Sequence, residues 1–319
     1  MTEIAESAEK GARIAMQSDN LDELKARIVE FVSQASTETT AHDESLLADL
    51  PRYLPAGATV YVAHLPRTEF RDVVRMCAQL VRLGLSPCPH VAARQMHSEA
   101  SLRASLNELR QAGVKQILLI AGDNKTPAGP YTSAVEILES GIIEDAAIKM
   151  IGVAGHPEGN RTIGPTRLKE ALVAKQAYAD RTGADVRLVT QFGFDPQAVL
   201  DWAHELKEQG IRLPIHVGIA GPTPLAKLIR FAMRCGIGTS LNNLMKNASA
   251  MSNLTRMATT PDAMVAGIIR GVIPDPESRI VKPHFFCFGG LIETVSWISA
   301  VRQGNFDLGE DAGSFALRH

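Results

Sequence analysis

Eight short apolar runs rich in β-branched residues recur along this chain, and they constrain its fold more than any other feature. They are bounded by Gly, Pro or polar residues and occupy 29–36, 58–65, 86–93, 115–122, 148–155, 186–194, 213–221 and 281–289. The runs are apolar almost throughout, which is typical of strands that are buried on both faces of a parallel sheet. The sequence therefore predicts eight parallel strands.

Segments of helical length and periodicity separate these runs. Apolar side chains in 68–84 form one stripe, and 98–113 begins at a serine suited to cap a helix and ends at Gly113. The other segments of this kind are 131–141, 166–183, 196–210, 224–236, 261–272 and 291–303. Because strands that alternate with helices imply right-handed crossovers, eight such units favour a closed (β/α)8 TIM barrel. An open doubly wound sheet is the alternative.

The chain length fits one barrel with additions. A barrel of this type needs about 250 residues, and the chain has 319. We expect an N-terminal helical extension over 1–28, a catalytic barrel over 29–305 and a C-terminal tail over 306–319. The amphipathic segment 239–260 is expected to be a helical insertion before the last strand and a candidate interface for a homo-oligomer.

Composition and motifs argue against several classes of protein. A net charge of -2 and an aromatic content of 5% predict no nucleic-acid surface. The four cysteines form no C-x-x-C pair and no metal-binding histidine spacing occurs, so no metal site is predicted. The N-terminus lacks a signal-peptide pattern, and no apolar run reaches the roughly 18 residues of a membrane span. We therefore expect a soluble cytoplasmic protein without a membrane partner.

Polar side chains recur at the C-terminal ends of the predicted strands, where the active site of such a barrel gathers. They are Glu38, His64, His90, Asp123, His156, Glu158 and Gln191. Each also has an ordinary explanation, such as a turn residue for Asp123 or a satisfied buried amide for Gln191. Their recurrence at one end predicts an active site. The chain has no nucleophile-elbow, Rossmann or Walker motif, so none of those site types is expected.

Five motifs on the predicted strands together resemble the methylenetetrahydrofolate reductase family of flavin-dependent (β/α)8 barrels. They are CPHVAAR at 88–94, IAGD at 120–123, IGVAGHPEG at 151–159, VTQFGFD at 189–195 and HFFCFGG at 284–290. The resemblance covers about residues 35–300. It implies an oxidoreductase that interconverts 5,10-methylenetetrahydrofolate and 5-methyltetrahydrofolate. FAD would carry hydride, with NADH or NADPH as co-substrate, in the one-carbon metabolism that serves methionine biosynthesis.

The resemblance also implies roles for individual residues. Glu38 stands where the family has its general acid, which protonates the departing ring nitrogen of the folate. Asp123 would tune charge beside flavin and pterin, Gln191 would hydrogen-bond the pterin edge, and Phe231 would stack on the p-aminobenzoate ring. FAD would contact His90, Tyr131, Ala154, His156, Glu158 and Lys175.

The chain departs from the family pattern mainly on the flavin side. Ala121 replaces the arginine of the family's R-G-D motif, and the first-strand motif is STETTAHD instead of E-F-F-P-P. The cations available to a flavin diphosphate are Arg94, Lys125, Arg161 and Lys175. Two alternatives therefore stay open. One is a flavin-independent folate enzyme, either a C1 transferase or a direct nicotinamide-dependent reductase, and the other is a non-catalytic folate-binding protein.

Overall fold

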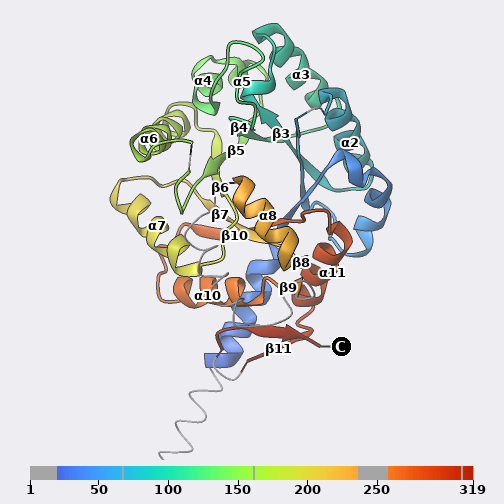
Figure 1. Ribbon diagram of the computed structural model, residues 1–319, viewed down its shortest axis with the longest axis vertical. Helices are drawn as coiled ribbons and strands as arrows, with labels where there is room; N and C mark the ends of the chain where they lie inside the picture. The colour runs from blue at the N-terminus through green and yellow to red at the C-terminus, as the bar shows by residue number, and fades with distance from the viewer. Residues whose placement is uncertain (1–19, 67, 161, 236–257, 310–311, 319) are drawn as a thin grey trace, which may run out of the picture.

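The barrel closes completely. The computed structural model describes residues 20–66, 68–160, 162–235, 258–309 and 312–318. Eight parallel strands close in the order β1-β10-β7-β6-β5-β4-β3-β2, with helices around them (Figure 1). Their bounds are β1 Ser36–Thr39, β2 Thr59–Val62, β3 Ser86–Ala92, β4 Gln116–Ile120, β5 Met150–Gly155, β6 Asp185–Thr190, β7 Ile215–Ala220 and β10 Ile280–Phe286. The predicted (β/α)8 TIM barrel is confirmed, and the open sheet is excluded.

Each of the eight segments with predicted helical periodicity contains a helix, and further helices lie outside those segments. They are α2 Phe70–Arg82, α3 Glu99–Gln111, α4 Ala134–Glu139, α5 Ile142–Asp145, α6 Pro165–Thr182, α7 Pro196–Glu208, α8 Leu225–Cys235, α10 Asp262–Val272 and α11 Leu291–Arg302, with 3-10 helices η1 Ala41–Arg52 and η2 Ala93–Gln95. Local chemistry sets their ends. Ser98 caps α3 by accepting from the backbone of Ser101, and α6 ends at Gly183 in the left-handed conformation.

The first strand differs from its prediction. The apolar run 29–36 is predicted to be a strand, but residues 20–33 are helical and β1 begins at Ser36. Leu24, Ile28, Phe31 and Val32 are all buried, and their spacing is that of one helix face. The run is therefore the buried stripe of a helix, which continues past residue 28.

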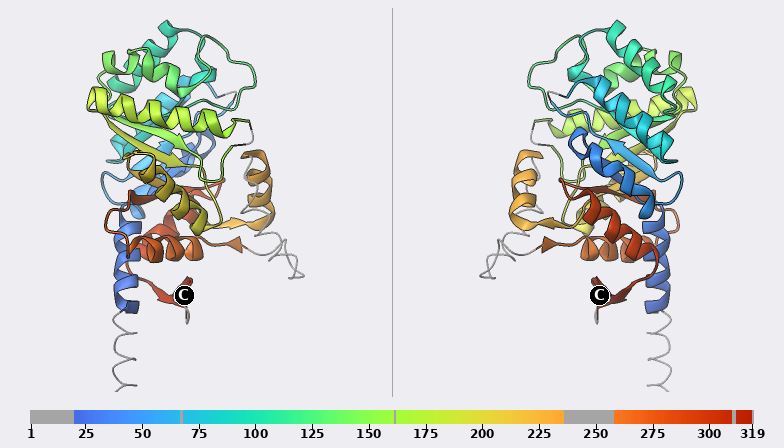
Figure 2. Two further views of the ribbon diagram at one scale, coloured as in Figure 1. Left: turned by 90° about the vertical axis from the view of Figure 1, so that its left-hand side faces the viewer. Right: turned by 90° about the vertical axis from the view of Figure 1, so that its right-hand side faces the viewer.

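The two ends of the described chain pack together. β11 (Phe306–Leu308) and β12 (Phe315–Leu317) form an antiparallel hairpin beside the helix at 20–33 (Figure 2). Lys25 of that helix donates to the backbone oxygen of Phe306 at 2.8 Å, and the Phe306 and Phe315 rings lie 4.6 Å apart. The predicted tail thus has a defined structure where it is described.

Most of the predicted insertion at 239–260 lies outside the described residues. Its end forms β9 (Ala258–Thr259), which pairs antiparallel with β8 (Thr223–Pro224). In Figure 1 α8 lies across the centre of the barrel, and in Figure 2 it stands off one side, so it overhangs the mouth at the C-terminal ends of the strands. No described helix is both long and apolar enough to cross a membrane.

Strand residues alternate between the helices and the barrel interior. On β10, Phe285 packs on Trp297 of α11 at 5.3 Å, whereas His284 lies 4.3 Å from the Tyr61 ring of β2. His284 is therefore packed inside the barrel and is fully buried. The middle layer of the interior consists of Tyr61, Cys88, Leu118 and Val189.

Candidate active site

A buried acid–imidazole pair lies at the C-terminal mouth of the barrel. Oε2 of Glu38 on β1 is 3.4 Å from Nε2 of His90 on β3, and the side chains are only 18% and 10% exposed. Burial, with a contribution from the Asp43 carboxylate, raises the pKa of Glu38 to about 7. Burial, with a contribution from His64, lowers the pKa of His90 to about 3. The pair is therefore neutral between about pH 3 and about pH 7, with the proton on the carboxyl.

Local structure fixes Glu38 at the strand end. Thr40 begins η1 with a capping box, in which its backbone N–H donates to Oδ2 of Asp43 at 2.9 Å. This turn stops β1 directly after Glu38 and Thr39. Behind the acid, Oγ1 of Thr37 lies 3.0 Å from Sγ of Cys287, which ties β1 to the residue after β10.

Gln191 follows β6 at the same mouth. Its Oε1 accepts from the backbone N–H of Phe192 at 3.1 Å, which orients the amide, and the side chain is half-buried. Neighbouring β7 approaches closely here because it carries Gly218. A Cβ at that glycine would lie 2.3 Å from the Thr190 carbonyl oxygen and 2.8 Å from the Phe286 ring. Glycine is required for β6 and β7 to pack this tightly below Gln191.

An aromatic cluster forms one wall of the mouth beneath α8. The Phe288 ring lies 4.6 Å from Phe231 of α8 and 4.8 Å from Phe192, and Phe286 stacks beside it at 6.0 Å. Phe231 and Phe288 are half-buried. The wall combines apolar surface with ring faces, which suits an aromatic ligand.

A second hollow lies at the end of β5, between α6 and α7. It has a volume of about 310 Å³, and Ala154, His156, Lys175 and Trp202 are among its lining residues. Lys175 is buried and its Nζ donates to the Ala154 carbonyl oxygen at 2.8 Å. Burial lowers the pKa of Lys175 to about 8, and burial together with this lysine lowers the pKa of His156 to about 4. Glu158 points toward the segment after β6, with Oε1 3.0 Å from a Cβ built on Gly193.

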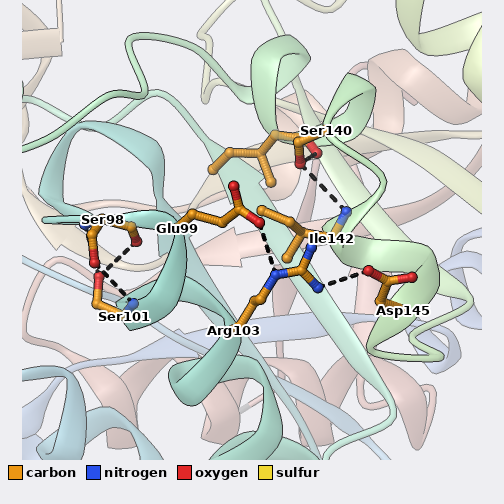
Figure 3. A network of polar contacts seen from close by, with 8 residues as sticks. Ser98, Glu99, Ser101, Arg103, Ser140, Ile142 and Asp145 are labelled. Atoms are coloured by element: carbon orange, nitrogen blue, oxygen red, sulfur yellow. Dashed lines mark hydrogen bonds and ion pairs between the residues drawn. The ribbon is translucent and has the colours of Figure 1, made fainter.

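Two of the predicted site residues lie apart from these groups. Asp123 is exposed on the loop after β4. Tyr131 is buried, and its hydroxyl lies near Ser140, with Glu99 and Arg103 of α3 also close by. These neighbours belong to a polar network on the outside of the barrel (Figure 3), in which Arg103 donates to Glu99 at 2.9 Å and to Asp145 at 2.7 Å. Tyr131 therefore contacts the helical layer.

The sequence profile of the methylenetetrahydrofolate reductase family matches residues 47–260. The chain belongs to this family. Methylenetetrahydrofolate reductase 2 of Saccharomyces cerevisiae, one relative, is 27% identical over 157 residues, which are 47% of this chain and 26% of that protein. The chain thus spans about a quarter of that relative's length.

Two solved structures are similar to this chain at low sequence identity. A Clostridium thermocellum protein described as binding two copies of 5-methyl-5,6,7,8-tetrahydrofolic acid is 11% identical, with a TM-score of 0.55 over 84% of this chain and 95% of its own. A mutant tryptophan synthase α-subunit from Pyrococcus furiosus is 13% identical, with a TM-score of 0.49 over 85% of this chain and 98% of its own. At 11% identity the likeness to the Clostridium thermocellum protein concerns the fold alone.

The sequence patterns assign no role to two sets of residues that the structure places beside the acid–imidazole pair or inside the barrel. His64 stands at a predicted strand end without an assigned role, and the structure places its charge close enough to lower the pKa of His90. Arg187 and Lys282 lie within runs interpreted as apolar strands, yet both face the barrel interior. Arg187 stands two positions before the inward-facing Val189, and Lys282 stands two positions before the inward-facing His284. Since side chains two positions apart on a strand share a face, this spacing is the sequence signal that both basic side chains point inward.

Proposed function

We propose that this chain binds a tetrahydrofolate at the C-terminal mouth and transfers hydride between its 5,10-methylene and 5-methyl forms. The Glu38–His90 pair carries the proposal, since it is a buried carboxyl that keeps its proton up to about pH 7 at the mouth of the barrel. Membership of the methylenetetrahydrofolate reductase family supports it.

The reaction needs one hydride and one proton. Hydride adds to the bridging methylene carbon, the bond from that carbon to N10 breaks, and N10 takes a proton as the five-membered ring opens. Glu38 is the proposed donor of this proton, because a carboxyl whose pKa lies near the working pH is efficient as a general acid. His90 supports this role by staying neutral, since an imidazolium at 3.4 Å would favour the ionised carboxylate.

The mouth also offers contacts for the two ends of the folate. Gln191 presents an oriented amide, which suits the hydrogen-bonding edge of a pterin. Phe231 and its partner Phe288 offer ring faces for the p-aminobenzoate group. Asp123, exposed after β4, is proposed as a second pterin contact and as a charge that tunes the reacting centre.

Two of the cations expected to meet a flavin diphosphate, Lys175 and Arg94, already have backbone partners in this structure. The Lys175 ammonium is buried on a backbone carbonyl. Arg94 donates from Nε to the Thr132 carbonyl at 2.8 Å and from Nη1 toward that of Asn124 at 3.4 Å. Ala121 brings no cation. Of the other two candidate cations, Lys125 is exposed on the loop after β4, and Arg161 lies outside the described residues. We therefore propose that NADH or NADPH donates hydride directly to the folate, without a flavin as intermediate carrier.

The test is the visible spectrum of the purified chain before and after FAD is added and the excess removed, followed by turnover assays. We expect no retained flavin band, and formation of 5-methyltetrahydrofolate from 5,10-methylenetetrahydrofolate with NADH or NADPH alone. A retained band that bleaches with the nicotinamide would return FAD as the carrier. Methylene transfer without nicotinamide oxidation would favour a C1 transferase, and tight folate binding without any turnover would favour a binding protein.

Two matched variants test whether turnover depends on the Glu38 carboxyl. Glu38→Gln should lose turnover and keep folate binding, whereas Glu170→Gln, on the exposed face of α6, should keep both. Near wild-type turnover in Glu38→Gln would remove Glu38 as the acid.

A further inference from the structure

Four side chains form a cluster inside the barrel near its N-terminal opening, which we call the cationic floor. They are Gln116 of β4, Arg187 of β6, His216 of β7 and Lys282 of β10. The first three are 3%, 8% and 4% exposed, and Lys282 is half-buried. Arg187 precedes Gln191 by four positions, which at about 3.3 Å per residue places it about 13 Å from the mouth.

Strand register places these residues together in the interior. Lys282 pairs directly with His216 across β10 and β7. Arg187 lies two positions before Val189, which belongs to the middle layer of the interior. Because strand side chains alternate, Arg187 faces the same way as Val189, and Lys282 the same way as His284.

The guanidinium of Arg187 is held in a fixed orientation. Its Nη2 donates to Oε1 of Gln116 at 2.8 Å, and Nε2 of Gln116 donates to Oγ of Ser86 at 2.8 Å. Nε of Arg187 and Nδ1 of His216 are buried and have no hydrogen-bond partner among the described residues. Buried polar atoms are normally hydrogen-bonded, and the guanidinium group of arginine stays protonated in proteins.

No carboxylate neutralises the floor at short range. Within the described residues, neither Arg187 nor Lys282 takes part in an ion pair. Asp185 at the start of β6 attracts Lys282 and partly offsets its repulsion from Arg187, but Asp185 is exposed. Two cations that lie close together inside a barrel are unfavourable unless an anion joins them.

We propose that the cationic floor binds a small oxyanion, either a phosphate or a carboxylate, that enters through the N-terminal opening. Four of the eight strand starts, Thr59, Ser86, Met150 and Asp185, are at least partly exposed, and the N-terminal end is therefore the side from which we expect the anion to enter. The N–H groups of Arg187 and His216 supply directed donors, and Lys282 supplies a point charge. The site is separate from the folate mouth and requires no part of the proposed reaction.

The test is chemical unfolding of the full chain in sodium phosphate, sodium acetate and sodium chloride at one ionic strength. Phosphate or acetate should lower the unfolding equilibrium constant relative to chloride, about tenfold at ten times the dissociation constant. An effect of phosphate alone assigns a phosphate ligand, and an effect of acetate alone assigns a carboxylate. No difference among the three salts would overturn the proposal.

Single substitutions test which residues cause the difference in stability between the salts. Arg187→Met and Lys282→Met should each abolish the difference between salts, whereas Arg270→Met, an exposed arginine on α10, should keep it. Lys175→Met should also keep it, which excludes the hollow beside β5. Arg187→Met is expected to fold, because an apolar side chain in place of an unpaired buried cation is often neutral or stabilising. An unchanged salt effect in Arg187→Met would overturn the proposal, and calorimetric titration of the wild type with phosphate and acetate gives a readout independent of any variant.

Discussion

Replacing Glu38 by glutamine should stabilise the fold at alkaline pH and leave it unchanged at acid pH. The native pKa of about 7 lies above the ordinary value of 4.5, so the native state holds this proton more tightly than the unfolded chain does. The stability that Glu38 contributes is therefore fully present below about pH 4.5 and is lost as the pH rises through about 7. Each pKa unit corresponds to about 1.4 kcal/mol, so the free energy of unfolding should change by about 3 kcal/mol.

The assay is urea unfolding of the wild type and of Glu38→Gln between about pH 4 and pH 9, with the difference in unfolding free energy plotted against pH. His90 contributes in the opposite direction, because its lowered pKa removes stability as the pH falls below 6.5 toward about 3. That contribution is common to both proteins and cancels in the difference. Glu170→Gln, an exposed control, should show no such trend.

The opposite sign would refute the reasoning. If Glu38 and His90 formed an ion pair, the glutamine variant would leave a buried imidazolium unpaired and would be less stable than the wild type near pH 6. The general-acid role would then lose its physical basis, since the carboxyl would be ionised at the working pH.

Three further perturbations test the packing of the site. Gly218→Ala should cost about 1–3 kcal/mol of unfolding free energy and weaken folate binding, because its Cβ would meet a carbonyl oxygen at 2.3 Å. Gly164→Ala, which meets nothing within 4 Å and affects only the N-cap of α6, should cost at most about 1 kcal/mol and leave folate binding unchanged in the same assays; an equal loss of folate binding in the two variants would contradict this account. Phe231→Ala should raise the folate dissociation constant roughly tenfold in a fluorescence titration, whereas Met233→Ala, at 54% exposure on the same helix, should not; equal constants would remove the aromatic wall from the site. The lowered pKa of Lys175 means that its contribution to stability is present above about pH 10.5 and lost as the pH falls through about 8. The free energy of unfolding of the wild type should therefore rise relative to that of Lys175→Met between pH 7 and pH 10 in urea unfolding. A difference that does not change with pH would contradict the lowered pKa of Lys175.

The sequence by itself determined the barrel and the rim on which the site lies. Apolar runs between amphipathic helices specify parallel strands, and the C-terminal ends of parallel strands in a closed barrel all meet at one mouth. The strand pattern alone therefore assigns Glu38, His90 and Gln191 to that mouth. The one strand placed wrongly, at 29–36, shows the limit of this reasoning. A short apolar run fits a buried helix stripe as well as a strand, and only its packing partners distinguish them.

The tertiary structure decided which groups meet and in what state of charge. Glu38 and His90 come from strands separated by β2, and the folded sheet places their side chains 3.4 Å apart on the inner face of the barrel. Lys175 turns inward to a carbonyl, while Tyr131 faces the helical layer, although the family resemblance assigns both to one cofactor. A pKa near 7 for a glutamate depends on burial by residues remote in sequence. Desolvation is a property of the packed interior, so no local pattern of residues encodes it.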